Sequence, residues 1–322
     1  MRDNFTSLTA SISKTLSLLA LLALLAYPEE RAQADLGFED IDCETPECLF
    51  YVDGEMTFCT GYRWDKLTTT VQRIIPPPFE AYEDHLSVKA ATSWQAGLKG
   101  RFTAYNWMGR LEGDYGWINQ GTYRQNKGNA NSPLIDASGK IPTGNTADLS
   151  IGFGYLYPIT SYFKVGPVLG LSYSYLKLMV SSRHTAGEPL KVIKGLKYRM
   201  DWQGPWFGVD ATYLGEAITV NAGYEYHWGT WFEQWILEGH QVGDRRALAD
   251  EQRSRNAWAN VAYVEGYWDL NACWYVGAGF KYKRWRTING FEDISQSSAN
   301  FERGFDATWQ SLMATFEIGY SY

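Results

Sequence analysis

One short segment of the sequence carries residues that could activate a water molecule. In the stretch LEGHQ, Glu238 precedes His240 by two positions. A carboxylate beside an imidazole orients and polarises the ring, which can then act as a general base toward water. The same two residues also occur by chance in solvent-exposed loops. They would indicate hydrolysis only together with a further catalytic group on another element.

A second candidate is the carboxylate pair Glu112 and Asp114, separated by Gly113 within an alternating strand. Alternation places both side chains on one face, which we expect to point into a barrel. Because basic residues occupy other positions of that face, we interpret the set as a salt-bridged interior and expect no enzymatic activity from it. The polar residues predicted for the interior are Lys99, Arg101, Arg110, Glu112, Asp114, Lys197, Arg199, Asp201, Glu225 and His227.

The four cysteines suit a disulfide-forming compartment better than a metal site. Cys43 and Cys48 are separated by four residues and could close a small loop around Pro46. Cys59 and Cys273 are both expected near one end of the barrel, where a second pair is conceivable. Further Cys or His ligands are missing near these positions, so we expect no metal and no cofactor.

The elements that carry these residues are strands with period-two alternation. In the last segment Leu312, Ala314, Phe316, Ile318, Tyr320 and Tyr322 share one face, and Met313 is the misfit on the other. Ten such segments follow residue 57, and Gly204-Pro205 is expected to shift the alternation in the sixth by one residue. The pattern predicts an all-β fold: a transmembrane antiparallel up-and-down β-barrel of about ten strands.

The connections sort into two lengths. Short ones are expected near 105–106, 158–160, 214–217 and 269–271, and long polar ones at about 69–86, 125–145, 183–192, 238–255 and 287–308. Short turns at one end and long loops at the other are typical of outer-membrane barrels. The final aromatic residues would close the barrel and resemble the signal that the outer-membrane insertion machinery reads: Phe316, Ile318, Tyr320 and Tyr322.

The N-terminal region has the three parts of an export signal. An apolar run from Leu16 to Tyr27 follows a basic start, and Ala32 and Ala34 suit a cleavage site. We therefore predict a signal peptide at 1–34, an acidic Cys-bearing periplasmic segment at 35–56 and an outer-membrane barrel at 57–322. The net charge of −7 without a basic tract argues against nucleic acid as a partner.

Strand number and several short segments make the chain similar to the omptin family of outer-membrane proteases. The similar pieces are LSVK, EGDYGW, GPWFGV and the closing strand. In omptins an aspartate pair faces an Asp-x-His pair across a groove. Glu238 and His240 match the second pair, with Glu in place of Asp, but the segment RQNKGNANSPLID lacks the paired aspartates. The resemblance implies a fold more clearly than an activity.

The signal peptide, the segment DIDCETPECLFYVDGE and the aromatic strands also resemble the Protochlamydia outer membrane proteins. That resemblance implies an abundant surface barrel, structural or porin-like. An omptin-like endopeptidase and a loop-mediated adhesin stay open as alternatives. The expected partners are the lipid bilayer, lipopolysaccharide, the insertion machinery and host surface molecules. Because ten strands lie near the filled end of barrel sizes, mixed interior charges could plug the lumen or line a thin wet passage.

Overall fold

The segments in which apolar and polar residues alternate form long antiparallel strands. The computed structural model describes residues 52–73, 82–129, 132–184, 192–242, 245–293 and 303–322. No helix within those ranges is long and apolar enough to cross a membrane. The strands are β1 (Val52–Arg73), β2 (Tyr82–Ala104), β3 (Trp107–Asn129), β4 (Ser132–Tyr155), β5 (Tyr157–Thr160), β6 (Phe163–His184), β7 (Val192–Leu214), β8 (Ile218–Val242), β9 (Arg245–Asp269), β10 (Trp274–Asp293) and β11 (Arg303–Ser321).

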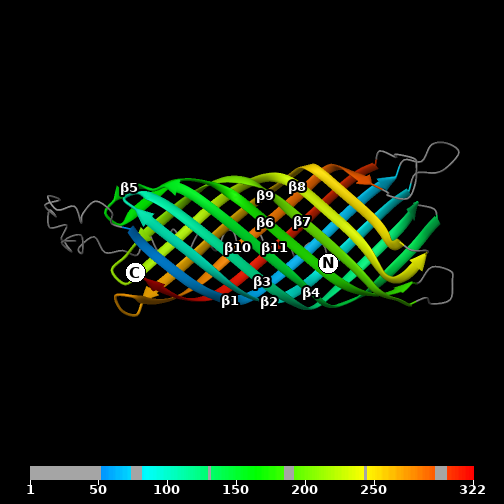
Figure 1. Cartoon of the computed structure of the whole chain (residues 1–322), viewed down its shortest axis with the longest axis horizontal. Coiled ribbons are helices and arrows are strands. Elements are labelled where there is room, and N and C mark those ends of the chain that lie inside the picture. The colour runs from blue at the N-terminus through cyan, green and yellow to red at the C-terminus, as the bar shows by residue number, and fades with distance from the viewer. Residues whose placement is uncertain (1–51, 74–81, 130–131, 185–191, 243–244, 294–302) are drawn as a thin grey trace. The chain divides into compact units, whose positions relative to one another are not determined.

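The sheet closes on itself, as Figure 1 shows. Except for β4 and β5, strands that are neighbours in sequence pair with each other. The strand β4 pairs directly with β6, and β1 pairs with β11 from Glu55↔Ser321 to Arg73↔Arg303. The short β5 continues β4 beyond Leu156, so the described residues form a ten-stranded barrel. The predicted all-β barrel is confirmed, and the last strand does pair with the first along its length, which removes both open edges.

Two details differ from the sequence-based expectations. The strands continue through most of the segments expected as long loops, so that β3 and β4 pair to Asn129↔Ser132 and β8 and β9 pair to Val242↔Arg245. The shift expected at Gly204-Pro205 is also absent, because the β6–β7 pairing runs without interruption from Phe163↔Tyr213 to Val180↔Leu196. Glycine and proline at 204 and 205 predicted a bulge, but regular pairing with β6 and β8 keeps β7 in one register across these positions.

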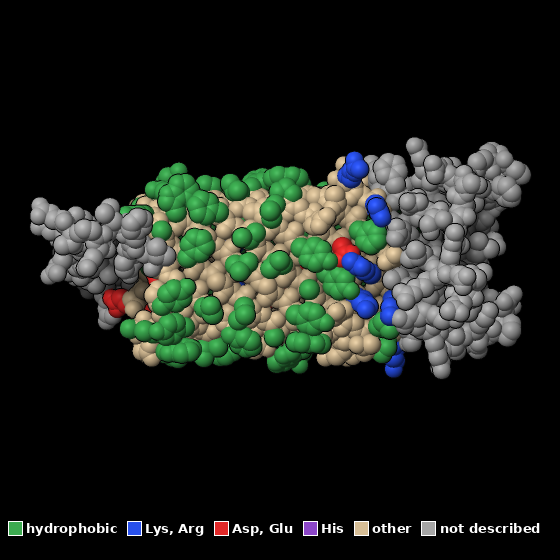
Figure 2. Space-filling view, viewed as in Figure 1, with side chains coloured by type: hydrophobic (Ala, Val, Ile, Leu, Met, Phe, Trp, Pro, Cys, Tyr) green, Lys and Arg blue, Asp and Glu red, His purple; other side chains and the backbone are tan. Residues whose placement is uncertain are grey.

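The outward face of the turn-side half is a hydrophobic band (Figure 2). Trp94 pairs with Tyr62 and Trp117 in one aromatic row, while Trp274 and Tyr320 pair in another near the turns. Exposed aliphatic residues lie between these rows. On β3 the exposed Trp107 near the turns and Trp117 in the other row are about ten residues apart. A strand tilted by about 45° needs roughly this length to cross a membrane. Two aromatic rows around an aliphatic belt are typical of an outer-membrane barrel.

Candidate functional site: the barrel interior

The interior of the turn-side half contains an ionic network that joins strands across the lumen. Lys99 Nζ on β2 lies 2.5 Å from Glu265 Oε1 on β9 and 2.6 Å from Glu317 Oε1 on β11. Lys281 on β10 pairs with Glu112 on β3. Charges removed from water are tolerated only when they find such partners, and these pairs connect opposite walls of the barrel.

A second part of this network is centred on Arg110. Its Nη1 lies 3.3 Å from Asp210 Oδ2 and donates to Tyr263 Oη at 2.6 Å, and its Nη2 pairs with Glu225. The guanidinium also lies 4.5 Å from the ring centroid of Trp206. Three strands, β7, β8 and β9, therefore converge on one cation from β3, which leaves little space for solute in this section.

The third part reaches toward the loop end of the lumen. The fully buried Arg63 places Nε 2.9 Å from Asp65 Oδ1 and Nη1 2.5 Å from Asp148 Oδ2. Lys283 Nζ lies 3.1 Å from the same Asp148 oxygen. Trp309 Nε1 donates to Asp65 Oδ1 at 2.8 Å, and its ring centroid lies 4.9 Å from the Arg63 guanidinium. This contact links the ionic network to an aromatic layer beyond it.

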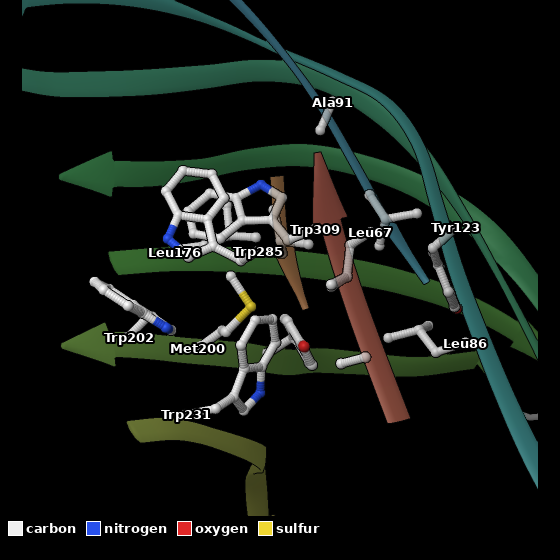
Figure 3. Close-up of a cluster of buried hydrophobic side chains, with 14 of the residues drawn as sticks. Leu67, Leu86, Ala91, Tyr123, Leu176, Met200, Trp202, Trp231, Trp285 and Trp309 are labelled. Atoms are coloured by element: carbon white, nitrogen blue, oxygen red, sulfur yellow. The ribbon is translucent and has the colours of Figure 1, made fainter. Parts of the chain in front are cut away.

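That next layer is a hydrophobic cluster inside the barrel (Figure 3). Trp285 and Trp309 stack with ring centroids 4.3 Å apart, and Trp202 and Trp231 are also buried. All ten long strands contribute to the cluster, which consists of Leu67, Val71, Leu86, Val88, Ala91, Ile118, Tyr123, Ile141, Leu176, Leu178, Val180, Tyr198, Met200, Trp202, Trp231, Ala257, Ala259, Trp285, Phe305, Ala307 and Trp309. We call it the aromatic layer. It crosses the lumen as a packed core crosses a soluble domain.

One group within the ionic network has the side chains of a nucleophile, a base and a carboxylate. His227 Nε2 lies 2.7 Å from Glu225 Oε2, and its Nδ1 lies 2.9 Å from Ser172 Oγ. The cavity beside them measures about 20 Å³, which holds about one water molecule. The ring centroids of Trp202 and Trp206 lie 5.4 Å and 5.8 Å from that of the imidazole. A substrate has no space there, so the arrangement serves to satisfy a buried histidine.

Three residues predicted for the interior lie on the outer face. Arg199 pairs with Lys177 and Asp201 pairs with Tyr175, while the alternate residues Met200 and Trp202 are fully buried inside. Lys197 lies two positions before Arg199 and therefore on the same outer face. The prediction was wrong because it assumed a one-residue shift at Gly204-Pro205, and an unbroken strand reverses every assignment on that side of the expected break.

The remaining predicted interior residues fall inside the lumen. Arg101 Nη2 donates to Thr212 Oγ1 at 3.1 Å, and Asp114 accepts from Cys59 Sγ at 3.4 Å. Cys59 and Cys273 are free thiols, so the pairing considered for them is wrong. Cys59 faces the lumen, whereas Cys273 lies in the segment between β9 and β10 next to Tyr320.

Two predicted sites lie wholly or partly outside the described residues. Cys43 and Cys48 belong to the N-terminal part that the structure does not describe. The backbone of Glu238 and His240 belongs to β8 and not to a loop, which corrects the expected position, but their side chains lie outside the described set. At the C-terminus Phe316, Ile318 and Tyr320 face outward in β11, with Tyr322 directly after it.

Sequence reasoning missed the aromatic layer. Tryptophan is enriched at membrane–water interfaces, yet Trp202, Trp231, Trp285 and Trp309 face the lumen. Their place in the alternation could have shown this. Trp309 shares a strand face with Ser311 and Glu317, and Trp285 shares one with Lys281 and Lys283. A tryptophan in phase with inward polar residues must also point inward.

A closed barrel with a lipid-facing band and a filled interior defines an integral β-barrel protein of the bacterial outer membrane. The sequence profile of the Protochlamydia outer membrane protein family matches residues 57–322, and the chain belongs to that family. No curated protein matches the chain.

The solved structures that match the chain include other outer-membrane proteins, of which OmpT shares the fold. The outer membrane protease OmpT from Escherichia coli superposes with a TM-score of 0.63 at 9% identity, covering 84% of this chain and 97% of that one. OprG from Pseudomonas aeruginosa gives a TM-score of 0.34 at 11% identity, covering 84% of this chain and 96% of its own. The toluene transporter TbuX from Ralstonia pickettii gives 0.33 at 10% identity, covering 82% and 89%. At such identities the likeness to OmpT concerns the fold alone.

Proposed function

We propose that this protein is a sealed structural barrel of the outer membrane, and not a diffusion pore. The observation that carries the proposal is the filled lumen, in which the aromatic layer covers the ionic network. Ten strands leave an interior close to the size that side chains can fill. A porin-like function would need a continuous aqueous path, and the buried aromatic layer together with the small cavity in the ionic network supports a lumen without one.

The proposal includes an orientation and a route to the membrane. The predicted signal peptide at 1–34 exports the chain, and the outward residues of the final strand engage the insertion machinery. The strand ends opposite the 105–106, 161–162, 215–217 and 270–273 turns face the cell exterior, where lipopolysaccharide and host surface molecules are the expected partners. Epitope tags inserted at 130–131 or 243–244 should then react with antibody on intact cells, and a tag at 215–217 should not. The reverse labelling would refute this orientation.

Solute flux through reconstituted barrels tests the proposed sealing. Liposomes that contain the refolded protein should swell no faster in small sugars or amino acids than liposomes without protein. An open barrel of known pore size provides the positive control. Swelling that depends on protein amount and falls with solute size would show that the barrel is a pore.

The fold shared with an outer membrane protease supports a protease as the second candidate. Glu238 and His240 lie in the loop-side extension of β8, beyond the hydrophobic band. A positioned general base contributes about 10²–10⁴-fold to a reaction rate. If the pair is catalytic, purified wild-type protein cleaves dibasic peptides and His240→Ala abolishes cleavage without unfolding the barrel. We expect no cleavage by either protein, because the segment RQNKGNANSPLID lacks the paired aspartates that would oppose Glu238 and His240.

A further inference from the structure

A belt of basic residues lies on the outer surface at the loop-side edge of the hydrophobic band. Figure 2 shows Lys and Arg side chains gathered at this edge on the visible face. On β1 Lys66 follows the exposed Trp64, and on β3 Arg124 follows the exposed Trp117. The belt therefore begins where the last lipid-facing aromatic side chain ends.

The opposite edge of the band has the other sign. Asp53, Glu216 and Asp269 are exposed at or beside the turn-side strand ends. An asymmetry of this kind matches two membrane surfaces that differ in charge, with the more anionic surface at the loop side. Electrostatic attraction to anionic lipid headgroups acts only on residues near the surface, because salt screens charges beyond about 10 Å.

One part of the belt is organised into a compact patch on β6 to β9. Lys177 and Arg199 are paired across β6 and β7. The Arg199 guanidinium lies 6.0 Å from the ring centroid of Phe232, and the Arg253 guanidinium lies 5.3 Å from the same ring. We call Lys177, Arg199 and Arg253 the β6–β9 basic patch. Two guanidinium groups that share one aromatic ring concentrate positive charge at the point where lipid headgroups begin.

The orientation of Arg199 is fixed by its neighbours. Its Nε lies 2.8 Å from Asp201 Oδ2, and Tyr173 Oη donates to Asp201 Oδ1 at 2.6 Å. Its guanidinium also lies 5.5 Å from the ring centroid of Tyr175. A guanidinium held in this way keeps a planar set of donors that matches phosphate geometry. The Asp201 carboxylate thus positions the Arg199 guanidinium, and Lys177 lies beside it on β6.

We propose that the β6–β9 basic patch binds a phosphate group of a lipid in the outer leaflet. The proposal rests on the proposed orientation, in which the loop end faces the cell exterior. A lipid is favoured over free phosphate because the exposed Phe207 and Trp228, with ring centroids 5.7 Å apart, lie further toward the membrane on β7 and β8, two of the strands that carry the patch. These rings receive an acyl chain while the patch receives the phosphate that belongs to it.

Native mass spectrometry of the purified, folded barrel with diphosphorylated lipid A in detergent tests this proposal. Replacing two cations by Lys177→Gln and Arg199→Gln should weaken lipid binding roughly tenfold or more. The matched control carries Lys89→Gln and Arg284→Gln, which remove the same charge from exposed belt positions on β2 and β10. The control should retain most of the binding, and both variants should keep the wild-type thermal transition. Arg199→Lys should bind with intermediate affinity, because it keeps the charge but loses the planar donors.

Three results would overturn the proposal. Equal losses in the patch variant and the control would show a general surface attraction and no site. Equal affinity for lipid A without its phosphates would remove the phosphate from recognition. Saturable binding of inorganic phosphate at the affinity of the lipid would identify free phosphate as the ligand. None of these measurements depends on whether the barrel conducts, so failure here is separate from failure of the proposed sealing.

Discussion

The turn-side and loop-side halves of the lumen are filled by different physical means. In the membrane-embedded half, ion pairs such as Lys99 with Glu265 and Lys281 with Glu112 bridge opposite walls. In the loop-side half, Trp285 stacks on Trp309 within a cluster to which every long strand contributes. Arg63, Asp65 and Trp309 join the two halves.

The difference follows from what surrounds each half. In the membrane-embedded half, apolar side chains face the lipid on the outside, while charged side chains pair with one another inside. The loop-side half extends past the hydrophobic band, where burying tryptophan side chains removes them from water and gives the usual hydrophobic stabilisation. Removing a side chain from each half should therefore have different consequences.

The largest effect is expected in the aromatic layer. Trp285→Ala and Trp309→Ala should each lower the free energy of unfolding by about 3–5 kcal/mol, because each leaves a large cavity. The double variant should lose less than the sum, since the second change removes a stacking partner that is already gone. Denaturant titration of barrels refolded in vesicles measures the losses. Trp64→Ala, on the outer face of β1, is the control and should cost clearly less.

A smaller effect is expected when one partner of an interior ion pair is removed. Lys281→Met leaves the half-buried Glu112 without its paired cation and should destabilise the barrel by about 3 kcal/mol. The double variant Lys281→Met with Glu112→Leu should recover most of that loss, because both desolvated charges disappear together. The same titration applies. A double variant no more stable than Lys281→Met would show that the pair does not act as a unit.

The smallest effect concerns a neutral hydrogen bond in the same half. Thr57 Oγ1 and Tyr275 Oη lie 2.6 Å apart between β1 and β10. Tyr275→Phe keeps the ring and removes one hydroxyl, so unfolding should become easier by only about 1 kcal/mol. A loss as large as that of Lys281→Met would mean that the ionic half depends on neutral hydrogen bonds as much as on charge pairing.

The sequence predicted the barrel because alternation is a local property that strand pairing preserves. The outward row of Phe316, Ile318 and Tyr320 and the closure of β11 on β1 follow directly from period two. The prediction of which residues face inward failed where glycine and proline were taken as a bulge, at Gly204-Pro205. The error moved Lys197, Arg199 and Asp201 to the wrong face and concealed the β6–β9 basic patch.

The interior partners could not be predicted, because they join strands far apart in sequence. Arg63 meets Asp148 across the lumen, and Lys99 meets Glu317 only because the barrel closes. The length of the strands was also hidden. Polar segments at 125–145 and 238–255 have the composition of loops, yet most of their described backbone continues as paired strands.

Single-channel recording in planar bilayers tests the sealed lumen most directly. Wild-type protein should insert without stable conductance steps. A variant that combines Trp202→Ala, Trp231→Ala and Trp309→Ala, with its fold verified by circular dichroism, should stay silent too, because the ionic network still closes the membrane-embedded half. Stable unitary conductance of the wild-type barrel in many independent insertions would contradict the account.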